Sequence, residues 1–260
     1  MNLIFDAGTG IRKLGLSMRH HREPLLLLFS HGHWDHIQGY PFFEPIYQPD
    51  REIVVCQGVE GNATALRALL EQMDGSNFPV RADQLPSRIS IIDEVAAYLA
   101  DQSFKTQRRE LNHPGGGNAY RVEEDGVSFV YITDNELEPP NAPSTTYAEW
   151  VDFCHGADLL VHDAQYIAAD MPAKHGWGHS LITQVRQLAV DAQVKNLAMY
   201  HHDPERTDSE LDEIAIESAR YFTSKNSTIG SYIAAEGLTF SLAARQDPKV
   251  STIDLYKRPD

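Results

Sequence analysis

The sequence predicts a layered α/β fold, and three observations carry that prediction. Short apolar runs such as Leu3–Asp6 and Leu25–Phe29 have the length of buried strands and end in polar loops that contain glycine. Apolar residues between Leu181 and Ala192 recur at helical spacing. Glycines and prolines separate the segments, and no repeat of about 20 to 50 residues is visible. Strands that alternate with amphipathic helices pack as sheets covered by helices on their outer faces.

The later strands are expected where further apolar runs of strand length occur. They are Glu52–Cys56, Arg88–Ile92, Phe104–Leu111, Ala119–Glu123, Val127–Thr133, Leu159–His162, Leu197–Tyr200 and Leu238–Leu242. Glu124-Asp125-Gly126 joins two of these runs and is typical of a tight hairpin turn. We therefore expect at least one antiparallel pair among the strands.

The helices are expected from apolar periodicity and from one capping signal. The periodicity predicts a helix over Asn62–Met73 and another over the apolar stripe that ends at Ala192. Thr207-Asp208-Ser209-Glu210 is a capping box, and the apolar residues from Leu211 to Phe222 then lie on one helical face. Beyond Pro143 the pattern therefore becomes helix, strand, helix, strand.

The composition is that of a folded globular protein and excludes several classes. Of the 260 residues, 42% are hydrophobic and 23% are charged, which rules out a disordered or fibrous chain. The formal net charge is −15 with neutral histidines. A field of this sign repels a long polyanion, so extended nucleic acid is not an expected partner.

The sequence has no feature of a membrane or exported protein. The longest uninterrupted apolar run, Leu25–Phe29, is far shorter than the roughly 20 residues of a membrane helix. No basic and then apolar leader opens the sequence, so we expect a cytoplasmic protein without membrane contacts. Two cysteines, Cys56 and Cys154, do not form a disulfide scaffold and are expected to be buried thiols.

The strongest chemical signal is His31-Gly32-His33-Trp34-Asp35-His36, directly after the run Leu25–Phe29. A buried strand would hold one end of this turn and preorganise its ligands. His31 and His33 can aim at one metal ion, and Asp35 and His36 at a second. A single histidine is more simply read as a structural residue. Packing four such groups together without a ligand is costly, so the motif predicts two metal ions.

Further potential ligands follow later strands of the predicted fold. His113, Asp134, Asp163 and His201 each come where an apolar run ends, and α/β proteins place their sites at strand ends. A binuclear centre needs about three protein ligands per metal, a bridging carboxylate and an open position for water or substrate. His202 competes with His201 for one ligand position, and we choose His201 because it directly follows the apolar strand.

The chain resembles the metallo-β-lactamase fold, whose hallmark is His-x-His-x-Asp-His followed by a His, an Asp and a His. The resemblance implies a four-layer αββα sandwich in one hydrolase domain over residues 1–243, followed by a polar tail over 244–260. It also implies two divalent metal ions, with zinc as the default and manganese or iron suiting the same donors. The implied ligands are His31, His33 and His113 on one ion, Asp35, His36 and His201 on the other, and Asp134 bridging both.

Within this superfamily the chain is most similar to the branch of tRNA 3′-processing endonucleases and small phosphodiesterases. Three segments stand where that branch has Gly-Asp-Thr, His-Glu-Ala-Thr and His-Ser-Thr: Tyr131-Ile132-Thr133-Asp134-Asn135, Val161-His162-Asp163-Ala164 and Gly178-His179-Ser180. By this resemblance His179 is the general acid, Asp163 orients it, and Asp35 is catalytic as well as ligating. The aspartate at 163 is one methylene shorter than the glutamate of that branch.

The resemblance and the site chemistry together predict a binuclear metal-dependent hydrolase that cleaves a phosphodiester in a small substrate, such as a cyclic nucleotide. Two cations would bind the phosphodiester oxygens and lower the pKa of a bridging water, so that hydroxide attacks near neutral pH. His179 would give the leaving alkoxide its proton. Trp177 and Tyr166 lie near His179 in the sequence and are candidates for stacking on a nucleobase.

Three other functions stay open at this point. tRNA 3′-processing endonucleases carry a long tRNA-gripping arm between the third metal histidine and the bridging aspartate, whereas 20 residues separate His113 from Asp134. A thioester or lactone hydrolase shares the metal motif, but the pair of His179 and Asp163 favours a phosphate ester. A non-catalytic sensor module would retain the metal only as a structural centre, which is closed and needs fewer ligands.

Two glycine-containing segments adjoin predicted metal ligands. Asp6-Ala7-Gly8-Thr9-Gly10 resembles a family feature in which the aspartate anchors backbone beside the metal loop. His113-Pro114-Gly115-Gly116-Gly117-Asn118 either places backbone amides near an anionic substrate or forms a flexible turn.

Relatives have one or two strands before the strand that ends at Asp6. Their absence would expose an unpaired edge, and we therefore expect a homodimer or reduced stability.

Overall fold

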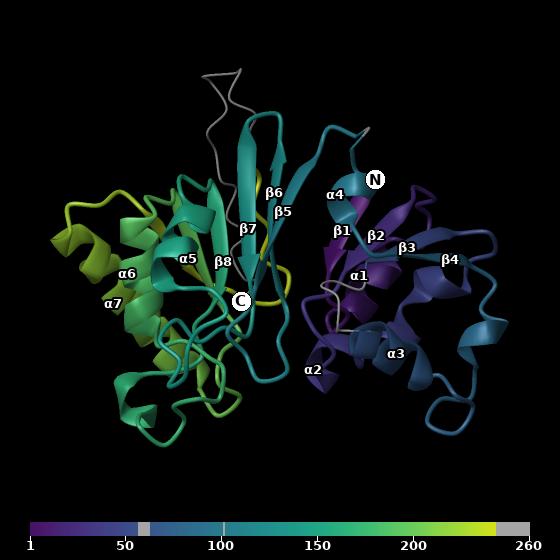
Figure 1. Cartoon of the computed structure of the whole chain (residues 1–260), viewed down its shortest axis with the longest axis horizontal. Coiled ribbons are helices and arrows are strands. Elements are labelled where there is room, and N and C mark those ends of the chain that lie inside the picture. Colours follow the sequence, from purple (N-terminus) through teal and green to yellow (C-terminus); the bar gives the residue numbers. More distant parts are fainter. Residues whose placement is uncertain (57–62, 101, 243–260) are drawn as a thin grey trace. The chain divides into compact units, whose positions relative to one another are not determined.

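The fold is described from a computed structural model over residues 1–56, 63–100 and 102–242. The chain divides into two compact units, Met1–Tyr98 and Leu99–Asp260, and each contains its own sheet (Figure 1). The polar tail expected over residues 244–260 lies outside the described residues. Within the described ranges, none of the helices combines the length and the hydropathy needed to cross a membrane.

The N-terminal unit is built on a four-stranded parallel sheet in the order β1-β2-β3-β4. Its strands are β1 (Asn2–Phe5), β2 (Leu25–Leu28), β3 (Glu52–Cys56) and β4 (Arg88–Ile92). Parallel neighbours need crossover connections, which here contain the helices. They are α1 (Ile11–Ser17), α2 (Trp34–Ile37), η1 (Tyr40–Phe42), η2 (Glu44–Tyr47), α3 (Ala63–Glu71) and η3 (Ala82–Gln84), and α4 (Val95–Tyr98) follows the last strand.

The core of this unit lies between one face of its sheet and the connecting helices. Leu25 and Leu27 of β2 pack in one apolar cluster with Ile11 of α1 and with Leu69 of α3. All four leucines of β2 are buried, as the central position of a parallel strand requires. The loop that follows β2 therefore starts from a rigid element.

The C-terminal unit contains a six-stranded mixed sheet in the order β10-β9-β8-β7-β6-β5. Its strands are β5 (Lys105–Glu110), β6 (Asn118–Glu124), β7 (Val127–Ile132), β8 (Leu159–Asp163), β9 (Asn196–Tyr200) and β10 (Gly230–Ile233). The first three pair antiparallel, and β7 to β10 run parallel. In the hairpin between β6 and β7, Asp125 and Gly126 have φ angles of 49° and 79°, which suit a tight turn of this handedness.

Three helices lie along one face of the second sheet: α5 (Tyr147–Cys154), α6 (Ile182–Asp191) and α7 (Asp208–Ser224) (Figure 1). A short helix, η4 (Ala168–Asp170), precedes α6. Leu160 of β8, Leu197 of β9 and Val185 of α6 belong to the apolar cluster that fills this layer. The Thr207 side chain accepts a hydrogen bond from the Glu210 amide, so the predicted capping box forms.

Most predicted elements are found within one or two residues of their expected bounds, but two expectations need correction. The strand predicted over Leu238–Leu242 is wrong, because those residues form no strand. The last strand is β10, which comes directly after α7 and pairs with β9 from Gly230 opposite Asn196. The ligand segment, expected as a turn, closes into the short helix α2. Both cysteines are buried free thiols, as expected.

Candidate metal centre

The first set of predicted ligands lies in one loop of the N-terminal unit, between the end of β2 and α2. His33 is extended at the start of α2, and the His36 amide donates to the His33 carbonyl at 3.0 Å. The ring of His31 lies 4.4 Å from that of His33 and 4.3 Å from that of His36, measured between centroids. Asp35 Oδ2 is 3.2 Å from His36 Nε2. The loop thus brings all four side chains together.

Asp6, at the end of β1, anchors this ligand loop. Its Oδ1 accepts the Ser30 amide at 2.7 Å, and its Oδ2 accepts the Ser30 hydroxyl at 2.7 Å. The same Oδ2 lies 2.9 Å from His36 Nδ1. A carboxylate can only accept hydrogen bonds, so His36 carries its proton on Nδ1 and directs the lone pair of Nε2 away from Asp6. The role of a backbone anchor that the resemblance implied for Asp6 agrees with these contacts.

The backbone after Asp6 pairs with the far end of the same loop. Ala7 donates to the His36 carbonyl at 2.7 Å and accepts from the Gly39 amide at 2.8 Å. A Cβ on Gly39 would come within 2.0 Å of the Gly8 carbonyl oxygen, so only glycine permits this close approach. The loop is therefore fixed at both ends by residues that follow β1.

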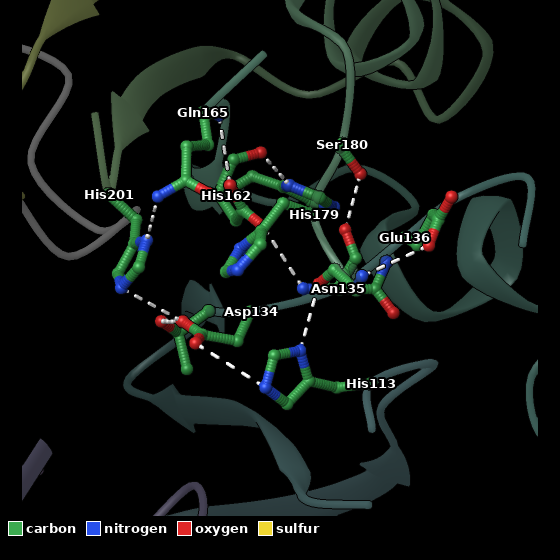
Figure 2. A network of polar contacts seen from close by, with 12 residues as sticks. His113, Asp134, Asn135, Glu136, His162, Gln165, His179, Ser180 and His201 are labelled. Carbon is green, nitrogen blue, oxygen red and sulfur yellow. Dashed lines mark hydrogen bonds and ion pairs between the residues drawn. The ribbon is translucent and has the colours of Figure 1, made fainter. Parts of the chain in front are cut away.

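The second set of predicted ligands lies in the C-terminal unit around Asp134, which follows β7. The Nε2 of His113 is 3.7 Å from Asp134 Oδ2, and the Nε2 of His201 is 3.2 Å from Asp134 Oδ1 (Figure 2). His113 follows β5 and His201 follows β9, so three strand ends contribute. Two imidazoles that face different oxygens of one carboxylate match the donors that a carboxylate shared between two cations requires.

Hydrogen bonds on the opposite ring nitrogens orient these two histidines. His113 Nδ1 lies 3.0 Å from the Gly178 carbonyl oxygen, which requires the proton on Nδ1 and leaves the lone pair on Nε2. His201 Nδ1 is 3.4 Å from the Gln165 side-chain amide. Turning that amide by 180° would offer its oxygen to Nδ1–H. The donor set thus fits a divalent cation, since ligating histidines are usually held in this way.

Three of these residues have a strained backbone. Asp134 and His201 have φ angles of 24° and 56°, and Asp6 in the N-terminal unit has 57°. Non-glycine residues rarely adopt positive φ, and such strain persists where the surroundings enforce it. Asp6 and His201 directly follow a strand, and Asp134 follows β7 after one intervening residue, so the turn out of each strand aims the side chain.

His179 and Asp163 form a pair beside His201 in the C-terminal unit. His179 Nδ1 is 3.0 Å from Asp163 Oδ2, so the shorter aspartate still reaches the imidazole. Asp163 is fully buried and also accepts the amides of Asn135 and Gln165 at 3.1 and 3.0 Å. The ring of His179 stacks on that of His201, with centroids 5.2 Å apart and planes 13° apart. The geometry directs the Nε2 edge of His179 away from Asp163.

Two other histidines of this region have lowered pKa values for the same reason. Burial lowers the pKa of His162, whose Nδ1 lies 2.6 Å from the Asp163 carbonyl oxygen. Burial also lowers the pKa of His202, and its Nε2 lies 3.2 Å from the Ala234 carbonyl oxygen. His202 is thus held against backbone, whereas His201 faces Asp134.

The two aromatic candidates for base stacking differ. Tyr166 is buried, and its ring packs edge-on against His179 at a centroid distance of 5.5 Å, so it offers no face to a nucleobase. Its expected stacking role is therefore wrong. Trp177 is 60% exposed and stays a candidate.

Sequence reasoning missed Asn135, Glu136 and Ser180, which hold the second set in place. The Asn135 side-chain oxygen accepts the amide of Asn112 at 3.0 Å, next to His113. The Ser180 hydroxyl donates to the Asn135 carbonyl at 2.5 Å. The only available signal was that these residues adjoin Asp134 and His179 in the sequence.

Comparison with known proteins identifies the family and the fold. A family model described as the beta-lactamase superfamily domain matches residues 1–202. Ribonuclease Z of Synechococcus sp. (strain CC9311) is 26% identical over 253 residues, which cover 77% of each chain.

Solved structures of several other proteins are similar in fold. A diphosphatase from the PhnP family has a TM-score of 0.59 and 17% identity over 93% of this chain and 80% of that chain. Zn²⁺-bound PqqB from Methylobacterium extorquens has a TM-score of 0.61 and 16% identity over 92% of this chain and 83% of that chain. The predicted metallo-β-lactamase fold class is therefore confirmed.

Proposed function

Because the chain belongs to the beta-lactamase superfamily, a family of metal-dependent hydrolases, we propose that it hydrolyses a phosphodiester bond in a small substrate such as a cyclic nucleotide. The observation that supports this most directly is the pair of His179 and Asp163 beside His201. A general acid is needed when the leaving group is an alkoxide, which is the case for a phosphodiester. The alternatives of a thioester hydrolase and a sensor module give no role to this pair.

The proposed metal ligands are the seven residues that the resemblance implies. His31, His33 and His113 would hold one ion, Asp35, His36 and His201 the other, and Asp134 would bridge the two. Two ions that need about three protein ligands each, with one carboxylate shared, account for all seven residues. Zinc is the proposed metal, since the similar PqqB structure is Zn²⁺-bound, although His and carboxylate donors also suit manganese or iron.

When bound, two such cations would supply Lewis acidity and a water of lowered pKa. The chain's own residues would then position and move the protons. Asp163 holds the His179 ring by its Nδ1–H, so that Nε2 can carry a proton toward the leaving oxygen. Asp6 and the Gly178 carbonyl hold His36 and His113 in the tautomer that presents Nε2.

A small substrate is favoured over RNA by the stretch between His113 and Asp134. The β6–β7 hairpin occupies residues 118–132 of this stretch, which leaves no room for a tRNA-gripping arm there. The net charge of −15 also disfavours a long polyanion. Processing of a tRNA 3′ end is the second candidate, because a similar curated protein is named ribonuclease Z.

The proposal is tested by turnover of bis(p-nitrophenyl) phosphate with metal content determined on the same samples. We expect about two metal ions per chain in the wild type. Asp134→Ala should lose metal and turnover together. His179→Ala should keep its metal and lose rate, by about 100- to 10,000-fold for a diester with an alkoxide leaving group and by less for this substrate, because p-nitrophenolate leaves without needing a proton.

Metal bound without turnover of this diester would contradict the phosphodiesterase proposal. A precursor tRNA assayed in parallel separates the second candidate. Cleavage of that RNA with poor turnover of cyclic nucleotides would replace the first proposal by the second.

A further inference from the structure

We propose that Glu136 is a positioning residue that fixes the loop Gly176–His179, and through it both His113 and the general acid His179. The proposal rests on the proposed function for the role of His179, but its structural part concerns the chain alone. Glu136 lies two residues beyond Asp134 and is 3% exposed. Because water hardly reaches it, its carboxylate needs hydrogen-bond partners within the protein.

The Glu136 carboxylate accepts two backbone amides of the loop. Its Oε1 accepts the Gly176 amide at 2.9 Å, and its Oε2 accepts the Gly178 amide at 3.0 Å. Both glycines have positive φ angles, 87° and 88°, which turn their amides toward one point. Hydrogen bonds to an ionised carboxylate are among the strong ones, so the pair defines the loop position.

The held loop presents two groups to the site. The carbonyl of Gly178 accepts from His113 Nδ1 at 3.0 Å, and the next residue is His179. A Cβ on Gly178 would come within 2.2 Å of His113 Nδ1, so loop and ring are in direct contact. A shift of the loop therefore moves the Gly178 carbonyl, which orients His113, together with the backbone of His179.

The loop borders two cavities. Glu136, Gly176 and Gly178 line a cavity of about 330 Å³ together with His113. A second cavity of about 220 Å³ is lined by Glu136, Glu138, His175 and His179. Hydrogen bonds must hold a loop where side chains do not fill the space beside it. The bonds from Ser180 to the Asn135 carbonyl and from His179 to Asp163 fix the far end of the loop.

The experiment compares Glu136→Ala and Glu136→Gln with Glu138→Gln, an exposed glutamate two residues further on. The first readout is amide hydrogen exchange at Gly176 and Gly178 in metal-free protein. The second is zinc affinity by competition with a chromophoric chelator. The third is turnover of two aryl phosphodiesters that differ only in leaving group, p-nitrophenolate against the poorer phenolate.

We expect Glu136→Ala to lose exchange protection at Gly176 and Gly178 while the strands of the sheet keep theirs. Zinc affinity should fall about 10- to 100-fold, because the acceptor of His113 is no longer fixed. The rate should fall more for the phenolate ester, as in a variant that lacks the general acid. Glu136→Gln, which keeps one acceptor oxygen, should fall between the wild type and Glu136→Ala.

Protection at Gly178 that survives in Glu136→Ala, or zinc affinity equal to that of Glu138→Gln, would overturn the proposal. Loss of protection throughout the C-terminal unit would also overturn it, since Glu136 would then support the fold as a whole. A wild type without phosphodiester turnover would refute the proposed function, while exchange and zinc affinity would still decide whether Glu136 positions the loop.

Discussion

The two units supply ligands in different ways. In the N-terminal unit, four candidates follow one another between His31 and His36, and a single carboxylate, Asp6, orients the loop. In the C-terminal unit, His113, Asp134 and His201 come from three strand ends. Hydrogen bonds between distant segments hold them, through Asn135, Glu136 and Gly178. A contiguous motif needs one anchor, whereas a dispersed set needs a network.

The difference has an energetic consequence. Backbone bonds also fix the contiguous loop, since Ala7 donates to the His36 carbonyl and α2 closes around it. Losing one side-chain bond there leaves the others in place. In the dispersed set, one residue can bond two distant segments, as Asn135 does with Asp163 and Asn112. We therefore expect substitutions in the C-terminal unit to have larger effects.

The largest effect is expected for Asp163→Asn. An amide in place of the carboxylate cannot accept the bonds of His179 Nδ1 and of the Asn135 and Gln165 amides together, and its NH₂ favours the wrong tautomer of His179. Turnover should fall about 100- to 10,000-fold while metal is retained. Metal analysis and steady-state kinetics check this. An unchanged rate would remove Asp163 from the mechanism.

Gly178→Ala should damage the dispersed set by displacing His113. Its Cβ would lie 2.2 Å from His113 Nδ1 and 2.4 Å from Pro114 Cδ, and φ is 88°. We expect zinc affinity to fall about 10- to 100-fold. Gly156→Ala is the matched control, because φ is 64° there but nothing lies within 4 Å of the Cβ. Equal losses in the two variants would show that strain, and not contact with His113, is responsible.

Asp6→Asn should weaken the contiguous set by a smaller factor. The amide nitrogen would face two donors, His36 Nδ1–H and the Ser30 hydroxyl, but the backbone bonds of the loop stay. Zinc affinity should fall about 10-fold, the low end for such orienting partners. Asp50→Asn is the control, since Asp50 also has a positive φ, 58°, but is exposed. A loss larger than that of Gly178→Ala would reverse the proposed contrast between the units.

The smallest effect concerns pH and the buried His162. Because burial lowers its pKa, the unfolded chain binds this proton below about pH 6.5 while the folded chain does not. The free energy of unfolding should therefore fall as pH falls below that value, by at most about 1.4 kcal/mol per pH unit. The fall should stop below the folded-state pKa.

Urea denaturation of metal-free protein between pH 5 and 7 tests this contribution. His162→Phe should show a shallower pH dependence than the wild type, and His155→Gln, which removes an exposed histidine, should not. Identical slopes in the wild type and His162→Phe would mean that His162 is protonated equally in both states.

The sequence predicted the elements and the contiguous motif well because both depend on local order. Strands such as Glu52–Cys56 were found from short apolar runs, and the capping box at Thr207 from four adjacent residues. The strand predicted over Leu238–Leu242 was wrong because an apolar run does not say which edge of a sheet is available. The edge beside β9 is taken by β10, which the sequence reaches first after α7.

The sequence by itself determined the family, the fold class and the identity of the candidate ligands, because all three follow from His and Asp residues at fixed spacings along the chain. Only the tertiary structure decided how those side chains are held. Glu136 meets Gly176 and Gly178 across 40 and 42 positions, and His113 meets the Gly178 carbonyl across 65. Hydrogen bonds over such separations follow from the packing of strands and loops, and they leave no periodicity or spacing that a sequence could display.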